Sequence, residues 1–211
     1  MINKSEQAYD KLESMITFRE LKPGGMVSES ELMTLTGMGR TPVREALQRL
    51  SAEKMVEIHP RRGILVPPIT VEAQLRLLEV RRNLEEQAVR LATHRSTMAQ
   101  KERMLQLAEA LLNFRDFDAI KEYGALLKET HRAVADAAGN EYLTMAMLPL
   151  QGLSRRFWFA NIKDVKAELS QAARLHGDVL KAICHGDEQA AGQASLTLND
   201  YLTEFAYHTL R

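Results

Sequence analysis

Apolar positions in the first 52 residues recur every three or four residues in three short segments, which is the spacing of one face of an α-helix. The first segment covers residues 5–20, with Ser5 as its predicted N-cap. The second begins after Ser28, and Glu31 three residues later completes the pattern of a capping box. The third begins near Arg40. Its predicted apolar face comprises Val43, Ala46, Leu47 and Leu50.

The pattern then changes to alternation, which is typical of β-strands. Residues 55–60 and 64–66 alternate in this way, and Arg61, Arg62 and Gly63 between them predict a tight turn. The expected order is therefore three helices followed by a β-hairpin, which is the order of a winged helix-turn-helix.

Pro67 and Pro68 form the only Pro-Pro pair, and each disfavours helix in the residue before it. From residue 70 to residue 210 the spacing predicts six further helices. We therefore predict a mainly α protein with two domains. Residues 1–68 form a winged helix-turn-helix with a small β-hairpin, and residues 69–211 form an all-helical antiparallel bundle.

Composition narrows the class of protein. The 211 residues carry 28 Lys and Arg against 28 Asp and Glu, so a uniformly basic coat for nucleic acid is excluded. The single cysteine, Cys184, cannot form an intramolecular disulfide, which favours a reducing compartment. No apolar run approaches the roughly 20 residues of a membrane span, and the polar N-terminus lacks a signal-peptide pattern. We expect a cytoplasmic protein with no membrane partner.

The basic charge is local. Residues 40–62 hold six Lys or Arg against three Glu, which indicates a polyanion partner, although a solvated helix face would look the same. The third helix presents Arg40, Thr41 and Arg44 near its start, where recognition helices contact base edges in the major groove. Winged folds that do not bind DNA exist, so the pattern alone leaves both readings open. Additional contacts to DNA are predicted from Arg49 on the same helix and from Arg62 and Gly63 at the hairpin tip.

Two histidines lie on the apolar faces of predicted bundle helices. His131 and His176 should both point inward, where an imidazole needs a partner. A hydrogen-bonded core histidine is the commoner situation for either residue alone, but two together indicate a shared polar cavity. Two imidazoles are too few for a tight metal site, which needs three or four ligands.

The block from Arg40 to Leu47, RTPVREAL, resembles the GntR family of bacterial transcription regulators, as do residues 22–24, 29–32 and 60–63. This resemblance implies operator binding as a homodimer, with DNA contacts from Arg40, Thr41, Arg44, Arg49 and Gly63. Two positions depart from the family pattern. Gly39 stands where a capping Ser is usual, and Lys54 stands where a Gly is usual.

The helical domain resembles the ligand-binding domain of the FadR branch of that family, through residues 80–85, His131 with residues 139–140, and residues 176–182 with residues 186–187. Many members hold a divalent metal through one Asp and three His. The matching positions here are Leu127, His131, His176 and Leu198, so the resemblance implies an incomplete site. Any metal bound by His131 and His176 should be weak, with Asn199 as a substitute ligand. Arg81 matches a cavity arginine that would pair with a ligand carboxylate, or it forms a salt bridge with Glu85.

The function that follows is a DNA-binding transcription regulator, a repressor whose helical domain senses a small carboxylate-bearing metabolite through Arg81, His131, His176 and Asn199. The alternative is a regulator or architectural DNA-binding protein whose effector cavity has collapsed around Leu127 and Leu198. An enzyme is disfavoured because Cys184 and His185 lack an orienting acid and an oxyanion donor.

Overall fold

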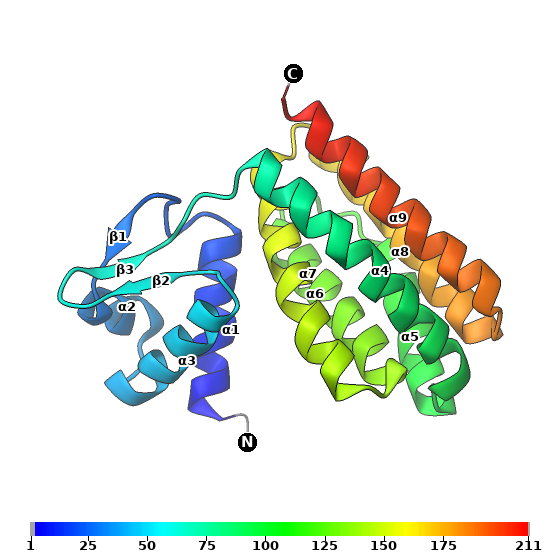
Figure 1. Ribbon diagram of the computed structural model, residues 1–211, viewed down its shortest axis with the longest axis horizontal. Helices are drawn as coiled ribbons and strands as arrows, with labels where there is room; N and C mark the ends of the chain where they lie inside the picture. Colours follow the sequence, from blue (N-terminus) through cyan, green and yellow to red (C-terminus); the bar gives the residue numbers. More distant parts are fainter. Residues whose placement is uncertain (1–2, 211) are drawn as a thin grey trace. The chain divides into compact units, whose positions relative to one another are not determined.

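The computed structural model describes residues 3–210, which are mainly helical with one small antiparallel sheet (Figure 1). The chain divides into two compact units. One contains the chain up to Thr70 together with Arg155–Ala160, and the other contains Val71–Ser154 and the residues from Asn161 onward. Within residues 3–210, no helix combines the length and the apolar character that a membrane crossing requires.

The first unit has the predicted order of a winged helix-turn-helix. Its elements are α1 (Lys4–Thr17), β1 (Met26–Val27), α2 (Glu29–Thr36), α3 (Arg40–Ala52), β2 (Glu57–His59) and β3 (Gly63–Leu65). The predicted apolar face of α3 is buried at all four positions. The strand β1 was not predicted, because two residues are too few to show alternation. It pairs with β3, which gives the sheet order β1-β3-β2 and sets Val27 opposite Ile64.

The start of α1 differs from the expectation. The N-cap is Asn3, whose side chain accepts a hydrogen bond from the backbone N–H of Ser5 at 3.2 Å. Ser28 caps α2 as predicted, accepting from the N–H of Glu31 at 3.2 Å. Gly39 is the N-cap of α3 and supplies no side-chain hydrogen bond. Its lack of a hydroxyl costs a few tenths of a kcal/mol relative to Ser.

The end of α3 explains why glycine is favoured where this chain has Lys54. The N–H of Met55 bonds the carbonyl of Leu50 at 2.8 Å, and the N–H of Lys54 bonds the carbonyl of Ser51 at 3.1 Å. These two bonds form a Schellman motif, which places its central residue in the left-handed region. Lys54 has φ of 62°, a conformation that costs a residue with a Cβ roughly 1 kcal/mol more than glycine.

The second unit confirms the predicted helical bundle. Its helices are α4 (Val71–Arg95), α5 (Met98–Leu112), α6 (Ile120–Ala138), α7 (Glu141–Asn161), α8 (Val165–His185) and α9 (Glu188–His208), except that Arg155–Ala160 of α7 belong to the first unit. Gly139 and Gly186 end α6 and α8 in the left-handed conformation. Pro149 lies inside α7, which continues through it.

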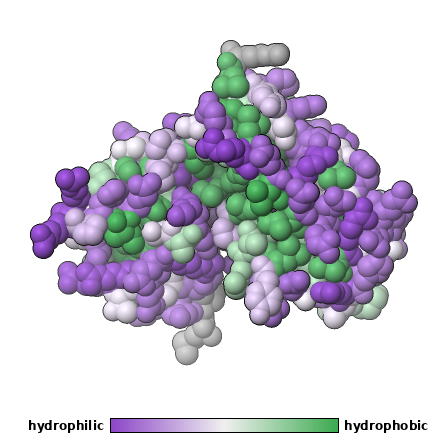
Figure 2. All heavy atoms as spheres, in the orientation of Figure 1, coloured by the Kyte–Doolittle hydropathy of each residue, from purple (hydrophilic) through white to green (hydrophobic). Residues whose placement is uncertain are grey.

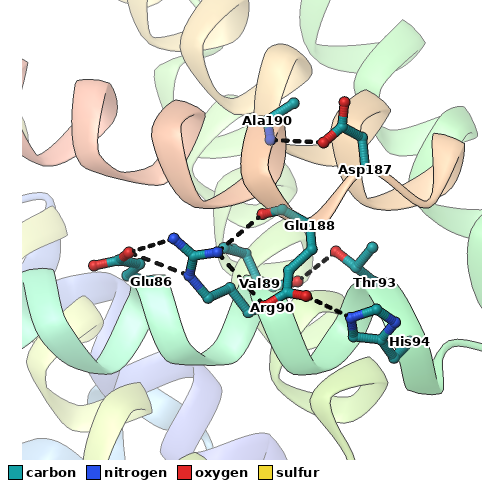
Figure 3. A network of polar contacts seen from close by, with 8 residues as sticks. All are labelled: Glu86, Val89, Arg90, Thr93, His94, Asp187, Glu188 and Ala190. Carbon is teal, nitrogen blue, oxygen red and sulfur yellow. Dashed lines mark hydrogen bonds and ion pairs between the residues drawn. The ribbon is translucent and has the colours of Figure 1, made fainter.

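A polar network joins α4 to the start of α9 (Figure 3). The guanidinium of Arg90 pairs with Glu86 at 2.8 Å and with Glu188 at 3.5 Å, and Glu188 also contacts His94 at 2.8 Å. A Cβ on Gly192 would lie 2.7 Å from the Nη2 atom of Arg90, so this glycine lets the guanidinium lie against the backbone of α9. The network is partly exposed and links these two helices.

The visible face of the bundle is hydrophilic along α9, whereas apolar side chains gather around α4 and α7 (Figure 2). The large apolar side chains that remain exposed in this unit include Val80 on α4 and Tyr142 and Met145 on α7.

Candidate functional site

The start of α3 carries the predicted DNA-reading residues on its exposed side. Arg40, Thr41 and Arg44 are all exposed, while Val43 between them is fully buried. Both arginines contact the same carboxylate: Nε of Arg40 lies 3.1 Å from one oxygen of Glu29, and Nε of Arg44 lies 2.8 Å from the other. Sequence reasoning missed Glu29, because it lies in another helix and nothing in the spacing connects it to α3.

Arg49 is held by several partners. Its guanidinium pairs with Glu6 at 2.9 Å and with Glu53 at 3.1 Å, and it stacks 3.6 Å from the centre of the Tyr9 ring. Partial burial works against the charged form, but the hydroxyl of Tyr9 and the two carboxylates outweigh it and raise the pKa of Arg49. The predicted contact of Arg49 with phosphate therefore has to compete with bonds inside the unit.

The turn between β2 and β3 forms the wing. Arg61 and Arg62 are exposed there, and Arg61 adopts a positive φ of 64°. Gly63 has φ of 118°, and a Cβ on it would lie 2.8 Å from the carbonyl oxygen of Val27. Glycine is thus required by the sheet itself, a structural role in addition to the predicted approach to DNA.

The helical unit contains a small cavity with a volume of ≈ 30 Å³. His131 and His176 both line it, as predicted, and their Nε2 atoms are 3.2 Å apart. Nδ1 of His176 lies 2.8 Å from the carbonyl oxygen of Ala172, which can only accept, so Nδ1 carries a proton. In the neutral pair, Nε2–H of His131 therefore donates to Nε2 of His176. The remaining lining residues are Glu85, Ala88, Val89, Thr130, Val134, Met147, Gln151, Val179, Leu180, Ser195 and Leu198.

Arg81 and Glu85 form a buried ion pair beside this cavity. Their side chains are only 2% and 7% exposed, and Nη2 of Arg81 lies 3.0 Å from Oε1 of Glu85. Gln151 donates to Oε1 of Glu85 at 2.5 Å, and Asn199 donates to Oε2 at 2.8 Å. Burial by itself would raise the pKa of Glu85, but the charge of Arg81 and these hydrogen bonds outweigh it and lower the pKa.

Of the two expectations for Arg81, the structure contains the salt bridge, and the contact with a ligand carboxylate stays a prediction. The guanidinium pairs with Glu85, in a buried bond rather than a surface one, and neither Arg81 nor Asn199 is among the residues that line the cavity. Arg81 and Glu85 lie on the buried face of α4. Asn199 of α9 is fully buried.

The residues around the two histidines do not complete a metal site of one Asp and three His. Leu198 lines the cavity beside them, and Leu127 is buried one turn before His131. Glu129 is half exposed and pairs with Arg103, so it is not directed at the histidines. In residues 3–210, no three His, Cys, Asp or Glu side chains gather as a metal-binding group.

Comparisons with known proteins find a separate family match for each of the two units. Residues 4–66 match the model of the bacterial regulatory proteins of the gntR family, and residues 76–200 match the FCD domain. The Nta operon transcriptional regulator of Aminobacter aminovorans is 32% identical over 174 residues, which cover 81% of this chain and 80% of that protein. The galactonate operon transcriptional repressor of Escherichia coli K12 is 26% identical over 93% of this chain and 94% of its own.

Among solved structures, McbR/YncC of E. coli is similar in fold. It superposes with a TM-score of 0.83 and 21% identity, and the match covers 100% of both chains.

Proposed function

The chain belongs to the GntR family of bacterial transcription regulators and carries an FCD domain, and from this premise we propose that it is a ligand-responsive repressor. In this proposal, residues 1–68 bind operator DNA, and residues 69–211 form a homodimer and bind a small organic acid. The observation that supports it most directly is the pair of chemically distinct sites: exposed arginines at the start of α3 and a histidine-lined cavity in the bundle.

The DNA-binding part rests on the geometry of α3. A recognition helix reads the major groove with its N-terminal residues, and arginine reads guanine through two parallel hydrogen bonds. Arg40, Thr41 and Arg44 share the exposed side of the first turns of α3. The exposed Arg61 and Arg62 of the wing suit contact with phosphates beside the groove.

Arg44→Ala is expected to weaken binding to the operator by about 1–3 kcal/mol, because the guanine contact is lost. The operator is first selected from random DNA, and the affinities for this DNA and for unrelated DNA are then measured by fluorescence anisotropy. Arg174→Ala, which removes an exposed arginine of α8, is the matched control and should change neither affinity. An Arg44→Ala protein that retained its full preference for the selected operator would contradict the assignment of α3.

A homodimer is proposed because a single winged domain contributes only a small interface with DNA. Two winged domains related by a two-fold axis would bind two half-sites of one operator. The exposed Val80, Tyr142 and Met145 of the bundle offer apolar surface for this contact. The same selection tests this part of the proposal. A palindromic operator supports a two-fold symmetric dimer, and a single asymmetric site contradicts it.

The lining of the cavity supports the proposal of a small amphipathic ligand. It combines apolar side chains with the two histidines, Thr130 and Ser195, and at ≈ 30 Å³ the cavity has to widen to admit an organic acid. Because Arg81 is paired with Glu85, the positive charge for a carboxylate has to come from the histidine pair. We therefore propose that His131 or His176 takes up a proton when an organic acid binds, and that the protonated imidazole pairs with the carboxylate of the acid. The two charges of the nearby Arg81–Glu85 pair cancel each other.

A carboxylic acid that binds this cavity is expected to raise the melting temperature more at about pH 6 than at about pH 8, because protonated imidazole is favoured at the lower pH. The screen compares organic acids with their uncharged amides, with and without divalent metal. His176→Gln should abolish the shift, whereas His94→Gln, which changes an exposed histidine of α4, should retain it. A complete absence of ligand-induced shifts would favour the alternative, a regulator without an effector.

A further inference from the structure

Glu29 holds both reading arginines of α3. It is the first residue of α2, and its two carboxylate oxygens contact the Nε atoms of Arg40 and Arg44 at 3.1 and 2.8 Å. Its side chain is 27% exposed, whereas those of Arg40 and Arg44 are 67% and 60% exposed. One carboxylate, supported by one helix, therefore orients two flexible side chains of another helix.

The part of each guanidinium that Glu29 uses is informative. The contacts are to Nε in both cases, so the outer edge of each guanidinium, between its two terminal nitrogens, takes no part in them. A guanidinium presents its N–H groups as a rigid planar fork, and a guanine needs only two of them, one for O6 and one for N7. The carboxylate can thus remain bound to Nε while the outer edge of the same guanidinium reads a base.

Glu29 also changes the charge of this surface. Arg40 and Arg44 are four residues apart on one helix face, where two positive side chains repel each other. The shared carboxylate offsets part of this repulsion and lowers the net positive charge that any phosphate backbone meets. Attraction to phosphates is the main source of binding to unrelated DNA, so Glu29 works against such binding.

We propose that Glu29 is a positioning residue that sets the sequence specificity of DNA binding. It holds the guanidinium groups of Arg40 and Arg44 in the orientation that contacts bases before DNA binds. It also makes these groups less available for contacts with phosphates, which occur in DNA of any sequence. Preorganised side chains lose less conformational freedom on binding, which favours the specific complex. This inference rests on the proposed function, since it assumes that these arginines read the operator.

The test compares Glu29→Gln with Glu31→Gln in the full-length protein. Both substitutions remove one negative charge from the first turn of α2, but only Glu29 contacts the two arginines. Affinities for the selected operator and for unrelated DNA are measured over a range of salt concentrations, together with the melting temperature.

Glu29→Gln is expected to lower the ratio of operator affinity to unrelated-DNA affinity about tenfold. It should also steepen the salt dependence on unrelated DNA by about one unit of log–log slope, because a released arginine neutralises a further phosphate. Glu31→Gln should strengthen both kinds of binding alike and leave the ratio unchanged. A role in stability alone would lower the melting temperature without changing the ratio.

A second measurement asks whether Glu29 acts through the arginines. In an Arg40→Ala/Arg44→Ala background, Glu29→Gln should have no further effect on the ratio. Equal ratios for Glu29→Gln and Glu31→Gln in an otherwise native protein would overturn the inference while leaving the proposed function intact. A native protein that showed no preference for any selected sequence would overturn both.

Discussion

Arg81→Met is expected to lower the free energy of unfolding by about 3–5 kcal/mol at neutral pH, because it leaves the buried carboxylate of Glu85 without its counter-charge. The methionine fills a similar volume, so the loss of packing is small. Arg90→Met is the matched control. Arg90 is in the same helix and also pairs with a glutamate four residues away, but that pair is partly exposed, so its loss should lower the free energy of unfolding far less. Denaturant unfolding measures both.

The pH dependence should change sign in the Arg81→Met protein. In the native protein the pKa of Glu85 is lowered, so its contribution to stability is present above the unfolded carboxyl pKa of about 4.3 and is lost as the pH falls through the folded pKa. Without Arg81, burial is expected to raise that pKa above the unfolded value. The variant should then lose stability as the pH rises past about 4.3, until the folded carboxyl ionises.

The double variant Arg81→Met/Glu85→Gln separates the charge from the hydrogen bonds. The buried Oε1 of Gln151 and Oδ1 of Asn199 accept no hydrogen bond in the structure, so an amide at position 85 can donate to one of them. Much of the lost stability should return, since no buried charge remains. A double variant as unstable as Arg81→Met alone would show that the guanidinium acts through packing and not through its charge.

The fold could be predicted from the sequence wherever burial follows a simple period. The apolar face of α3 illustrates this, because Val43, Ala46, Leu47 and Leu50 lie at helical spacing and are all buried. Capping by Ser28 and the glycine ends of α6 and α8 are similarly local, so short segments reveal them. Strand β1 was missed because its two residues are defined only by their pairing with β3.

The candidate site was predictable only in part, for the same reason. His131 and His176 lie on apolar faces, and this pattern was sufficient to bring them together. Arg81 and Glu85 are charged, so no hydrophobic pattern marks them as buried, although their mutual pairing allows burial. Asn199 and Gln151 complete that network from α9 and α7, and no spacing within one helix reveals contacts between helices.

Leu127→Asp combined with Leu198→His is expected to raise the affinity for Zn²⁺ or Ni²⁺ about a thousandfold or more, because it supplies the two missing ligands of a four-ligand site. Two nitrogens that lie about 2.1 Å from one ion at octahedral to tetrahedral angles are about 3.0–3.4 Å apart. The Nε2 atoms of His131 and His176 are already 3.2 Å apart. Leu198 lines the same cavity, and Leu127 is buried one helical turn before His131.

The native protein, purified without added metal, should carry well under one transition-metal ion per chain, since two imidazoles alone hold an ion weakly. Metal content is measured by elemental analysis and affinity by competition with a chromophoric chelator. The metal affinity of the single variant Leu198→His, with three imidazoles, should fall between those of the native protein and the double variant. This variant tests the prediction even if the double variant folds poorly. Leu127→Asn with Leu198→Gln is the control for added polarity, and it should gain little affinity. One tightly held zinc or nickel per native chain would contradict the incomplete site, because it would require Glu129 or Asn199 to leave its present partner and turn toward the histidines.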